Sequence, residues 1–267
     1  MVALVTTAAR LPSAGAAGPA PPDTVILEEL TWTEVRDLIR AGKTTIIVPT
    51  GGTEQNGPHM ALGKHNRRVQ VNAEAIARRL GNALVAPVLA YVPEGSVDPP
   101  AGHMRYAGTI TLPDPWFEKV LEFAARSFKA HGFRDIVFIG DSGENQPGQR
   151  KVAARLNQEW ARTHVRVHAI EAYYRATAVL RDQLRAEGYP ERDVDGHAGL
   201  VDTALMLAID PRLVRTDRFS AAVAPGSGAT GDPGRARAEL GRPGVEAVVA
   251  RTVDAIREAT RHARAAD

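Results

Sequence analysis

Hydrophobic and polar positions change their spacing repeatedly along the chain from Thr24 onward. Short runs of consecutive apolar and β-branched residues, which are typical of buried strands, alternate with longer stretches in which apolar residues recur every three or four positions, as on one face of a helix. This alternation predicts βαβ units, in which parallel strands are joined by crossover helices. We therefore expect an α/β fold with a mostly parallel sheet, and the sequence contains no internal repeat.

The expected elements follow from the runs themselves. The apolar runs that we interpret as strands cover residues 44–49, 83–92, 108–112, 135–140 and 165–172. The helical stretches cover residues 69–80, 114–132, 197–209 and 245–263, and a further helix rich in Ala and Arg follows residue 145. Asp114 is expected to cap the second of these helices and Gly132 to end it.

The N-terminal residues 1–23 are rich in Ala, Gly and Pro and follow neither helical nor strand periodicity. We expect them to form a flexible arm in front of a single domain at residues 24–267. A clipped or mis-started signal peptide is the alternative, because Ala14-Gly15-Ala16 imitates a cleavage site although Arg10 is the only basic residue of the arm. The first interpretation favours a cytoplasmic protein and the second an exported one.

Composition narrows the class of protein. A chain of 267 residues with 44% hydrophobic residues has enough apolar material for one large core. The sequence contains no run of about eighteen apolar residues, the length that a helix needs to cross a bilayer. The 33 Lys and Arg residues are interleaved with 31 Asp and Glu residues, so we expect no nucleic-acid partner and no membrane partner. The chain has no cysteine, so a metal ion would be bound by His, Asp or Glu.

Polar side chains crowd into two loops that follow predicted strands. The loop at residues 50–66 carries Glu54, His59 and His65 between glycines, and the other loop covers residues 140–146. Ligands of open α/β sheets bind at the carboxyl ends of the strands, which favours a binding site here over a surface turn with solvated histidines. A phosphate-binding loop is disfavoured, because no Gly-Lys-Ser or Gly-Lys-Thr follows Gly51-Gly52.

The residues of these loops resemble a known signature. The string Gly52-Thr53-Glu54-Gln55-Asn56-Gly57-Pro58-His59-Met60-Ala61-Leu62 is similar to the Gly-Ser-Thr-Glu-Gln-His-Gly-Pro-His-Leu-Pro-Leu signature of the creatininase (creatinine amidohydrolase) family. Three later blocks agree with segments of that family in order and spacing, at residues 102–109, 140–145 and 197–203. The resemblance spans residues 46–208, with a weaker match at residues 231–233.

The resemblance implies a three-layer α/β/α sandwich with a mostly parallel central sheet. It also implies a homo-oligomer, a hexamer by analogy with the family, that hydrolyses a C–N bond of a small-molecule substrate with two divalent metal ions. The five ligand positions of the family fall on Glu54, Asn56, His65, Ser142 and Glu144. Only the two glutamates match in type, because the family has His at the positions of Asn56 and Ser142 and a bridging Asp at that of His65.

These changes alter the metal site that we expect. A neutral imidazole has one free lone pair, so His65 is not suited to bridge two ions, and two carboxylates balance a single divalent ion. We therefore expect one zinc, manganese or iron ion on Glu54, His65 and Glu144, with a further ligand from the weaker candidates Asn56, Ser142, Asp141 and His59. The alternative is a metal-free polar pocket that keeps only the fold.

Proton transfer is assigned by the same resemblance to His197, which aligns with a family residue placed near the leaving nitrogen. Asp202 is expected to orient the imidazole or to accept a hydrogen bond from the substrate, so the expected catalytic set is His197, Asp202 and Glu144. The candidates for the substrate pocket are His59, His103 and Asn145.

These residues predict a metal-dependent amidohydrolase that opens, or in reverse closes, an amide, lactam or cyclic guanidine-like bond. We expect no true creatininase activity, because three of the five ligand positions have changed type. A catalytically degenerate, oligomeric small-molecule binding protein is the alternative, and metal content distinguishes the two.

Overall fold

The computed structural model of the chain describes residues 22–194 and 196–265, and its centre is a four-stranded parallel sheet. The strands are β1 (Thr45–Thr50), β2 (Ala83–Val85), β3 (Asp135–Gly140) and β4 (Arg166–Ala169). They lie in the order β2-β1-β3-β4, and Thr45 of β1 is level with Ala83 of β2 and with Asp135 of β3. The predicted parallel sheet is confirmed, whereas residues 1–21 of the predicted arm lie outside the described residues.

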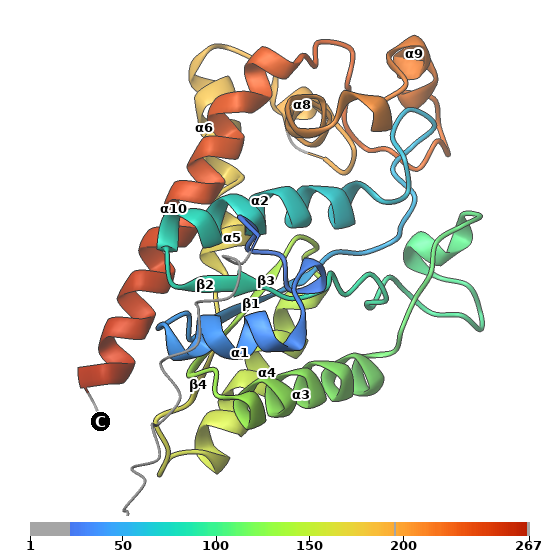
Figure 1. Cartoon of the computed structure of the whole chain (residues 1–267). Coiled ribbons are helices and arrows are strands. Elements are labelled where there is room, and N and C mark those ends of the chain that lie inside the picture. The colour runs from blue at the N-terminus through green and yellow to red at the C-terminus, as the bar shows by residue number, and fades with distance from the viewer. Residues whose placement is uncertain (1–21, 195, 266–267) are drawn as a thin grey trace, which may run out of the picture.

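Helices cover both faces of this sheet (Figure 1). The α-helices are α1 (Trp32–Arg40), α2 (Lys64–Leu80), α3 (Asp114–His131), α4 (Asn145–Glu159), α5 (Ala172–Arg175), α6 (Ala178–Ala186), α7 (Glu191–Val194), α8 (Leu200–Ile209), α9 (Phe219–Ala222) and α10 (Ala238–Ala265). Short 3-10 helices lie at η1 (Leu27–Glu29), η2 (Gly102–Arg105), η3 (Pro211–Leu213) and η4 (Thr216–Arg218). Three predicted helices start elsewhere: α2 five residues earlier, α8 three residues later and α10 seven residues earlier than expected.

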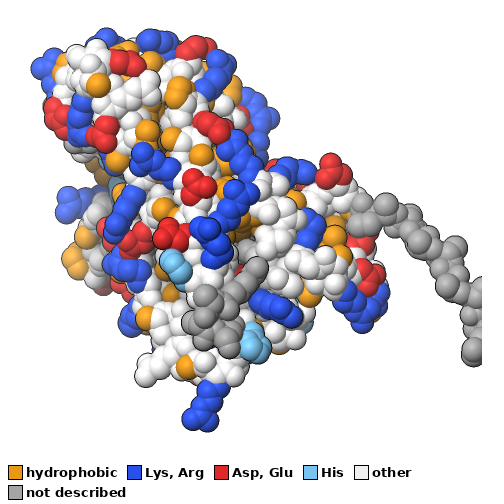
Figure 2. Space-filling model, turned by 90° about the vertical axis from the view of Figure 1, so that its left-hand side faces the viewer, with side chains coloured by type: hydrophobic (Ala, Val, Ile, Leu, Met, Phe, Trp, Pro, Cys, Tyr) orange, Lys and Arg blue, Asp and Glu red, His pale blue; other side chains and the backbone are white. Residues whose placement is uncertain are grey.

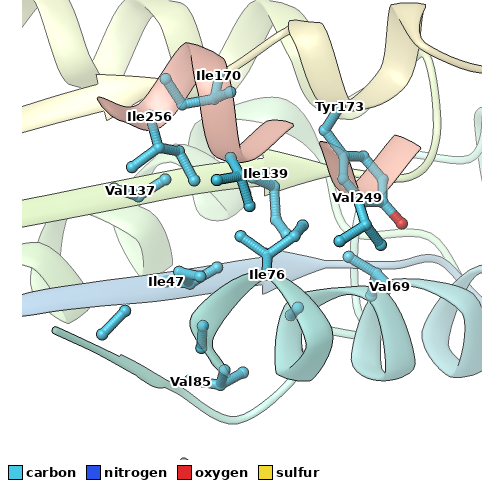
Figure 3. Packing of buried hydrophobic residues seen from close by; sticks show 14 of the residues in the cluster. Ile47, Val69, Ile76, Val85, Val137, Ile139, Ile170, Tyr173, Val249 and Ile256 are labelled. Atoms are coloured by element: carbon cyan, nitrogen blue, oxygen red, sulfur yellow. The ribbon is translucent and has the colours of Figure 1, made fainter. Parts of the chain in front are cut away.

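Strands β1, β2 and β3 each contribute to two hydrophobic cores, because successive side chains point to opposite faces of the sheet, whereas β4 contributes to one. Ile47 and Ile139 pack against α2, α5 and α10 on one face (Figure 3). Ile46 and Phe138 pack against α3 and α4 on the other face, with α1 beside them. Burial on both faces explains why the strands read as continuous apolar runs. The α/β/α sandwich is confirmed.

Strand β2 is shorter than the apolar run at residues 83–92. It ends at Val85, two residues before Pro87, which has no N–H with which to continue the hydrogen-bond ladder. The chain rejoins the sheet only at Leu89, whose N–H donates to the Pro49 carbonyl over 2.9 Å and which forms a single bridge with Thr50. The run therefore contains one short strand and an irregular extension.

The prediction of a strand at residues 108–112 is wrong. Within that segment only Ile110 pairs, in one antiparallel bridge with Thr53, because the β-branched residues cross the loop after β1 instead of joining the sheet. The predicted capping role of Asp114 is wrong as well. Pro113 is the N-cap residue of α3, and Asp114 is the first helical residue.

The surface agrees with the interleaved charges of the sequence. Figure 2 shows Lys and Arg side chains lying among Asp and Glu side chains over the face turned to the viewer. Within the described ranges, no helix combines the length and the apolar character that a membrane span requires.

Glu122 of α3 ties this helix to α4 and makes their contact sensitive to pH. Its carboxylate accepts hydrogen bonds from Lys119 at 2.9 Å, from Arg126 at 3.0 Å and from Arg155 of α4 at 3.0 Å. The hydrogen bond from Lys119, with those from Arg126 and the charge of Arg155, lowers the pKa of Glu122 from 4.5 to about 2, against a smaller effect of burial. The carboxylate therefore stays ionised in the folded protein at a pH where the unfolded chain takes up a proton.

We predict that Glu122→Gln destabilises the protein at neutral pH and that this effect fades in acid. A carboxyl with a lower pKa in the folded state adds stability above its unfolded pKa and loses it as the pH falls toward the folded value. The difference in unfolding free energy between wild type and variant should thus narrow as the pH falls from about 4.5 toward about 2. Urea unfolding over a pH series measures it, with Glu258→Gln on the exposed face of α10 as control; a difference that stays constant with pH would contradict the prediction.

Candidate active site

A pocket of about 330 Å³ opens at the carboxyl ends of β1 and β3, where the sequence predicts the binding site. Its walls come from the loop after β1, the first turns of α2, η2, the loop after β3, the α5–α6 segment and the residues around the start of α8. Its polar lining includes Glu54, Lys64, His65, Arg68, His103, Asp141, Ser142, Glu144, His197 and Asp202. The two loops singled out in the sequence therefore meet in one cavity, together with the His197 segment.

The loop after β1 is held by two asparagines. Asn145 donates to the Gly51 carbonyl and to the Thr50 hydroxyl, each over 2.8 Å, and the Asn66 side chain accepts from the Gly52 N–H over 3.0 Å. A Cβ at Gly51 would lie 2.1 Å from Asn66 Oδ1, so only glycine allows this close approach. The loop then carries Glu54 to a position where it is 2% exposed.

Three carboxylates and three basic side chains form a closed, alternating ring that lines the pocket. We call it the charge ring and define it by Glu54, Lys64, Asp202, Arg68, Asp141 and His65. Lys64 Nζ lies 3.5 Å from Glu54 and 3.1 Å from Asp202. Arg68 lies 2.9 Å from Asp202 and 2.6 Å from Asp141.

His65 closes the charge ring. Its Nδ1 lies 2.5 Å from Asp141 Oδ1 and its Nε2 lies 2.7 Å from Glu54 Oε1. Carboxylates accept hydrogen bonds and do not donate them, so His65 offers its ring N–H groups to the two carboxylates and is counted with Lys64 and Arg68 as the third basic member of the ring. Tyr173 adds a donor from outside, because its hydroxyl donates to Asp141 Oδ2 over 2.6 Å.

The three carboxylates stay ionised inside the protein. Burial alone would raise the pKa of Glu54, but His65 and Lys64 hold it well below its usual range. Burial likewise acts against ionised Asp141, and Arg68 and His65 more than compensate, so that its pKa is also lowered. Lys64 and Arg68 have the same effect on the pKa of Asp202. Each carboxylate thus depends on two ring cations.

His197 lies just before α8 and projects into the pocket. Ala198 adopts the left-handed conformation, with φ 57°, and Gly199 is the N-cap residue, so α8 starts at Leu200 and His197 stays outside the helix. Its Nε2–H donates to the Gln55 carbonyl over 2.8 Å, and its Nδ1 faces Glu54 Oε1 at 3.7 Å. Burial, with the charge of Lys64, lowers the pKa of His197 to about 4, so the imidazole is neutral at neutral pH.

His103 contacts the other oxygen of Glu54. Its Nε2 lies 3.1 Å from Glu54 Oε2, and its Nδ1 accepts from the Gln55 side-chain amide over 3.0 Å. The Gln55 amide is oriented by two backbone groups, because the Gly57 N–H donates to its Oε1 and its NH₂ donates to the Gly228 carbonyl. In this arrangement the His103 proton therefore sits on Nε2 and points to Glu54.

Glu54, His103 and His197 are the residues whose ligand atoms converge: one atom of each lies within 4.8 Å of the others. One carboxylate and two imidazoles are donors that zinc and related divalent ions accept. Of the predicted ligands, His65 uses both nitrogens in the charge ring, and Glu144 is exposed at the start of α4 on the pocket wall.

Several predicted site residues lie beside the pocket and do not line it. Asn56 is fully buried and donates to the carbonyls of Glu54 and Ala61, and His59 contacts the Thr203 hydroxyl and the ring of Phe219. Asn145 supports the loop after β1. Ser142 and Asp141 do line the pocket, whereas the partner of the His197 Nε2–H is the Gln55 carbonyl and not Asp202.

Three buried groups near the pocket escaped the sequence analysis. Lys64 and Arg68 were not singled out, although they directly precede the apolar stripe of α2, because charged residues at a helix start usually face solvent. Glu94 is 1% exposed, and its two oxygens have no hydrogen-bond partner among the described residues. Burial and the neighbouring Glu54 raise the pKa of Glu94 to about 10, so it keeps its proton at neutral pH.

Comparison with known proteins agrees with this fold and this pocket. The family described as Creatininase: Creatinine amidohydrolase matches residues 28–256, so the chain belongs to the creatininase family of metal-dependent amidohydrolases. A creatinine amidohydrolase of Pseudomonas putida is 29% identical over 202 residues, which cover 73% of this chain and 75% of that protein. A mycofactocin precursor peptide peptidase of Mycolicibacterium smegmatis is 29% identical over 182 residues, 65% of this chain and 61% of that relative.

Solved structures of creatininases extend the likeness to the whole fold. A structure titled Creatininase Mn has a TM-score of 0.74 and 28% identity, and covers 88% of this chain and 98% of its own. A mutant creatininase described as the Zn-Zn type has a TM-score of 0.69 and 27% identity, with the same coverage. The two titles and the convergence of Glu54, His103 and His197 together suggest a divalent metal, without fixing its identity.

We predict that Asp202→Asn destabilises the protein by about 3–5 kcal/mol, because it leaves two buried cations of the charge ring short of a partner. Asp182→Asn is the matched control: its side chain is 71% exposed and pairs with Arg185 at the surface, where the expected loss is under about 1 kcal/mol. Urea unfolding of both variants at pH 7 measures the difference. Equal losses would show that the ring adds nothing beyond a surface ion pair.

Proposed function

We propose that this pocket hydrolyses an amide, lactam or cyclic guanidine-like C–N bond of a small molecule with the help of one zinc, manganese or iron ion. The observation that carries the proposal is the convergence of Glu54, His103 and His197 within 4.8 Å inside a pocket of about 330 Å³. A pocket of that volume admits a small molecule. Membership of an amidohydrolase family supports the reaction type.

The residues present fit one ion better than two. The resemblance implies five ligand positions for two ions, and three of them have changed. Asn56 faces loop carbonyls, His65 belongs to the charge ring and Ser142 stands in the place of a histidine. For one ion, Glu54, His103 and His197 would be the ligands, in place of the predicted set Glu54, His65 and Glu144. When bound, the ion would supply Lewis-acid polarisation of the scissile carbonyl.

The two histidines differ in how ready they are to bind. His197 is neutral and keeps its proton on Nε2, so Nδ1 offers a lone pair beside Glu54. His103 must move its proton from Nε2 to Nδ1, and the Gln55 amide must then turn its oxygen toward the ring. The buried carboxyl of Glu94, which has no hydrogen-bond partner among the described residues, lies beside Glu54 and would add negative charge only if a bound ion made it release its proton.

Proton transfer falls to a residue that neither binds the ion nor belongs to the charge ring. With His197 as a ligand and Asp202 bound to Lys64 and Arg68, we assign it to Glu144, which lines the same pocket. A carboxylate oxygen of Glu144 would take the proton of the attacking water and pass it to the leaving nitrogen.

The homo-oligomeric state and the cellular compartment that the sequence analysis expects stay predictions.

A small-molecule binding protein without turnover is the second candidate. The charge ring favours it, because its carboxylates are balanced by side chains and do not require an ion for charge compensation. The two candidates differ in whether a bound small molecule is opened.

The test is turnover of protein that has been stripped of metal and reloaded with zinc or manganese. The substrates are lactams, cyclic ureas and cyclic guanidines, with creatinine as an expected non-substrate, and NMR detects the ring-opened product. We predict that Glu144→Gln lowers kcat by about 10²–10⁴ with little change in KM. Glu54→Gln and His103→Ala should lose the ion and turnover together.

His131→Ala, at the exposed end of α3, is the control for these variants and should keep both properties. Ring-opening by Glu144→Gln at the wild-type rate would remove Glu144 from proton transfer. If the loaded protein binds members of the panel and opens none of them, the binding protein is the correct interpretation.

A further inference from the structure

We propose that Lys64, His65 and Arg68 take the place of a second metal ion, so that each pocket of this chain binds at most one divalent ion. The proposal builds on the proposed function because it concerns the same pocket. Its test counts ions and does not depend on turnover, so the two can fail separately. A relative described as the Zn-Zn type shows that this fold also accommodates two ions.

The first argument is the occupancy of carboxylate oxygens. Both oxygens of Asp141 face Arg68, with His65 and Tyr173 as further partners. Asp202 gives one oxygen to Arg68, and the other to Lys64 and the Ala198 N–H.

Glu54 differs from the other two carboxylates of the ring. Its Oε1 faces His65 and Lys64, whereas its Oε2 faces His103 and no cation of the charge ring. Glu54 Oε2 is thus the ring oxygen that contacts no basic side chain of the ring; it faces His103, whereas His197 Nδ1 lies 3.7 Å from Oε1. A single oxygen supports one ion at this place, and a second ion would have to displace a side-chain cation.

The second argument is charge. The three cations balance the three carboxylates, and all six side chains are at most 21% exposed. A second divalent ion among them would add two positive charges next to Lys64 and Arg68, with no unpaired ring carboxylate to offset them. An ion on Glu54 Oε2 would instead lie at the edge of the ring, beside His103.

The third argument is that the basic side chains of the ring all belong to one helix. The three cations come from the first five residues of α2, and the carboxylates come from the loop after β1, the end of β3 and α8. The charge ring therefore fixes these segments relative to one another through side chains of the chain itself. A bridging metal ion is not needed to assemble the pocket.

The test is the number of ions per chain. Wild type, stripped with a chelator and titrated with zinc or manganese in a calorimeter, should bind no more than one ion, and elemental analysis after dialysis should agree. In Lys64→Met/His65→Asp the ring loses two positive charges and gains one carboxylate. We expect this variant to bind one ion more than wild type and to gain thermal stability on adding zinc.

Lys151→Met/His131→Asp makes the same two substitutions at exposed positions of α4 and α3, and its ion number should equal that of wild type. Two ions in wild type would overturn the proposal, whether or not the ring variant folds. An ion number in a folded ring variant that is no higher than in wild type would overturn it as well. Circular dichroism of each variant establishes that it is folded.

Discussion

The pocket depends on one interaction, the closed alternation of three cations with three carboxylates. No member could remain charged alone at this depth, because taking an ion out of water costs several kcal/mol that only a close opposite charge offsets. Since every member touches two partners, the ring joins α2 to the loop after β1, to the end of β3 and to α8. The position of the pocket walls therefore follows from the placement of these six charges.

The sequence predicted the sheet well because its strands are buried on both faces and read as continuous apolar runs, such as the one from Asp135 to Gly140. It also predicted that the loops after β1 and β3 meet, because the carboxyl ends of parallel strands share one edge. The prediction failed at residues 108–112, which form no strand. Their β-branched residues favour an extended backbone whether or not it pairs with a neighbouring strand, and only the tertiary structure decides whether such a segment joins the sheet.

The charge ring could not be read from the sequence for a different reason. Arg68 meets Asp141 and Asp202 across separations of 73 and 134 residues, and nothing local distinguishes it from a solvated arginine on an amphipathic helix. Likewise, the resemblance placed His65 at a ligand position, where a neutral imidazole is the ordinary expectation. Only the structure shows that two carboxylates occupy both of its ring nitrogens, which removes it from the set of available ligands.

Gln55 links the ring to the ion that the pocket would hold. Its carbonyl accepts from His197 Nε2 and leaves Nδ1 open, whereas its amide donates to His103 Nδ1 and places the His103 proton against Glu54. Gln55 thus leaves Nδ1 of His197 free to bind an ion and holds His103 in the tautomer whose Nε2 carries the proton. An ion that binds through both histidines must shift that proton to Nδ1 and turn the amide, so its affinity is coupled to the tautomer of His103 and to the orientation of a single side chain.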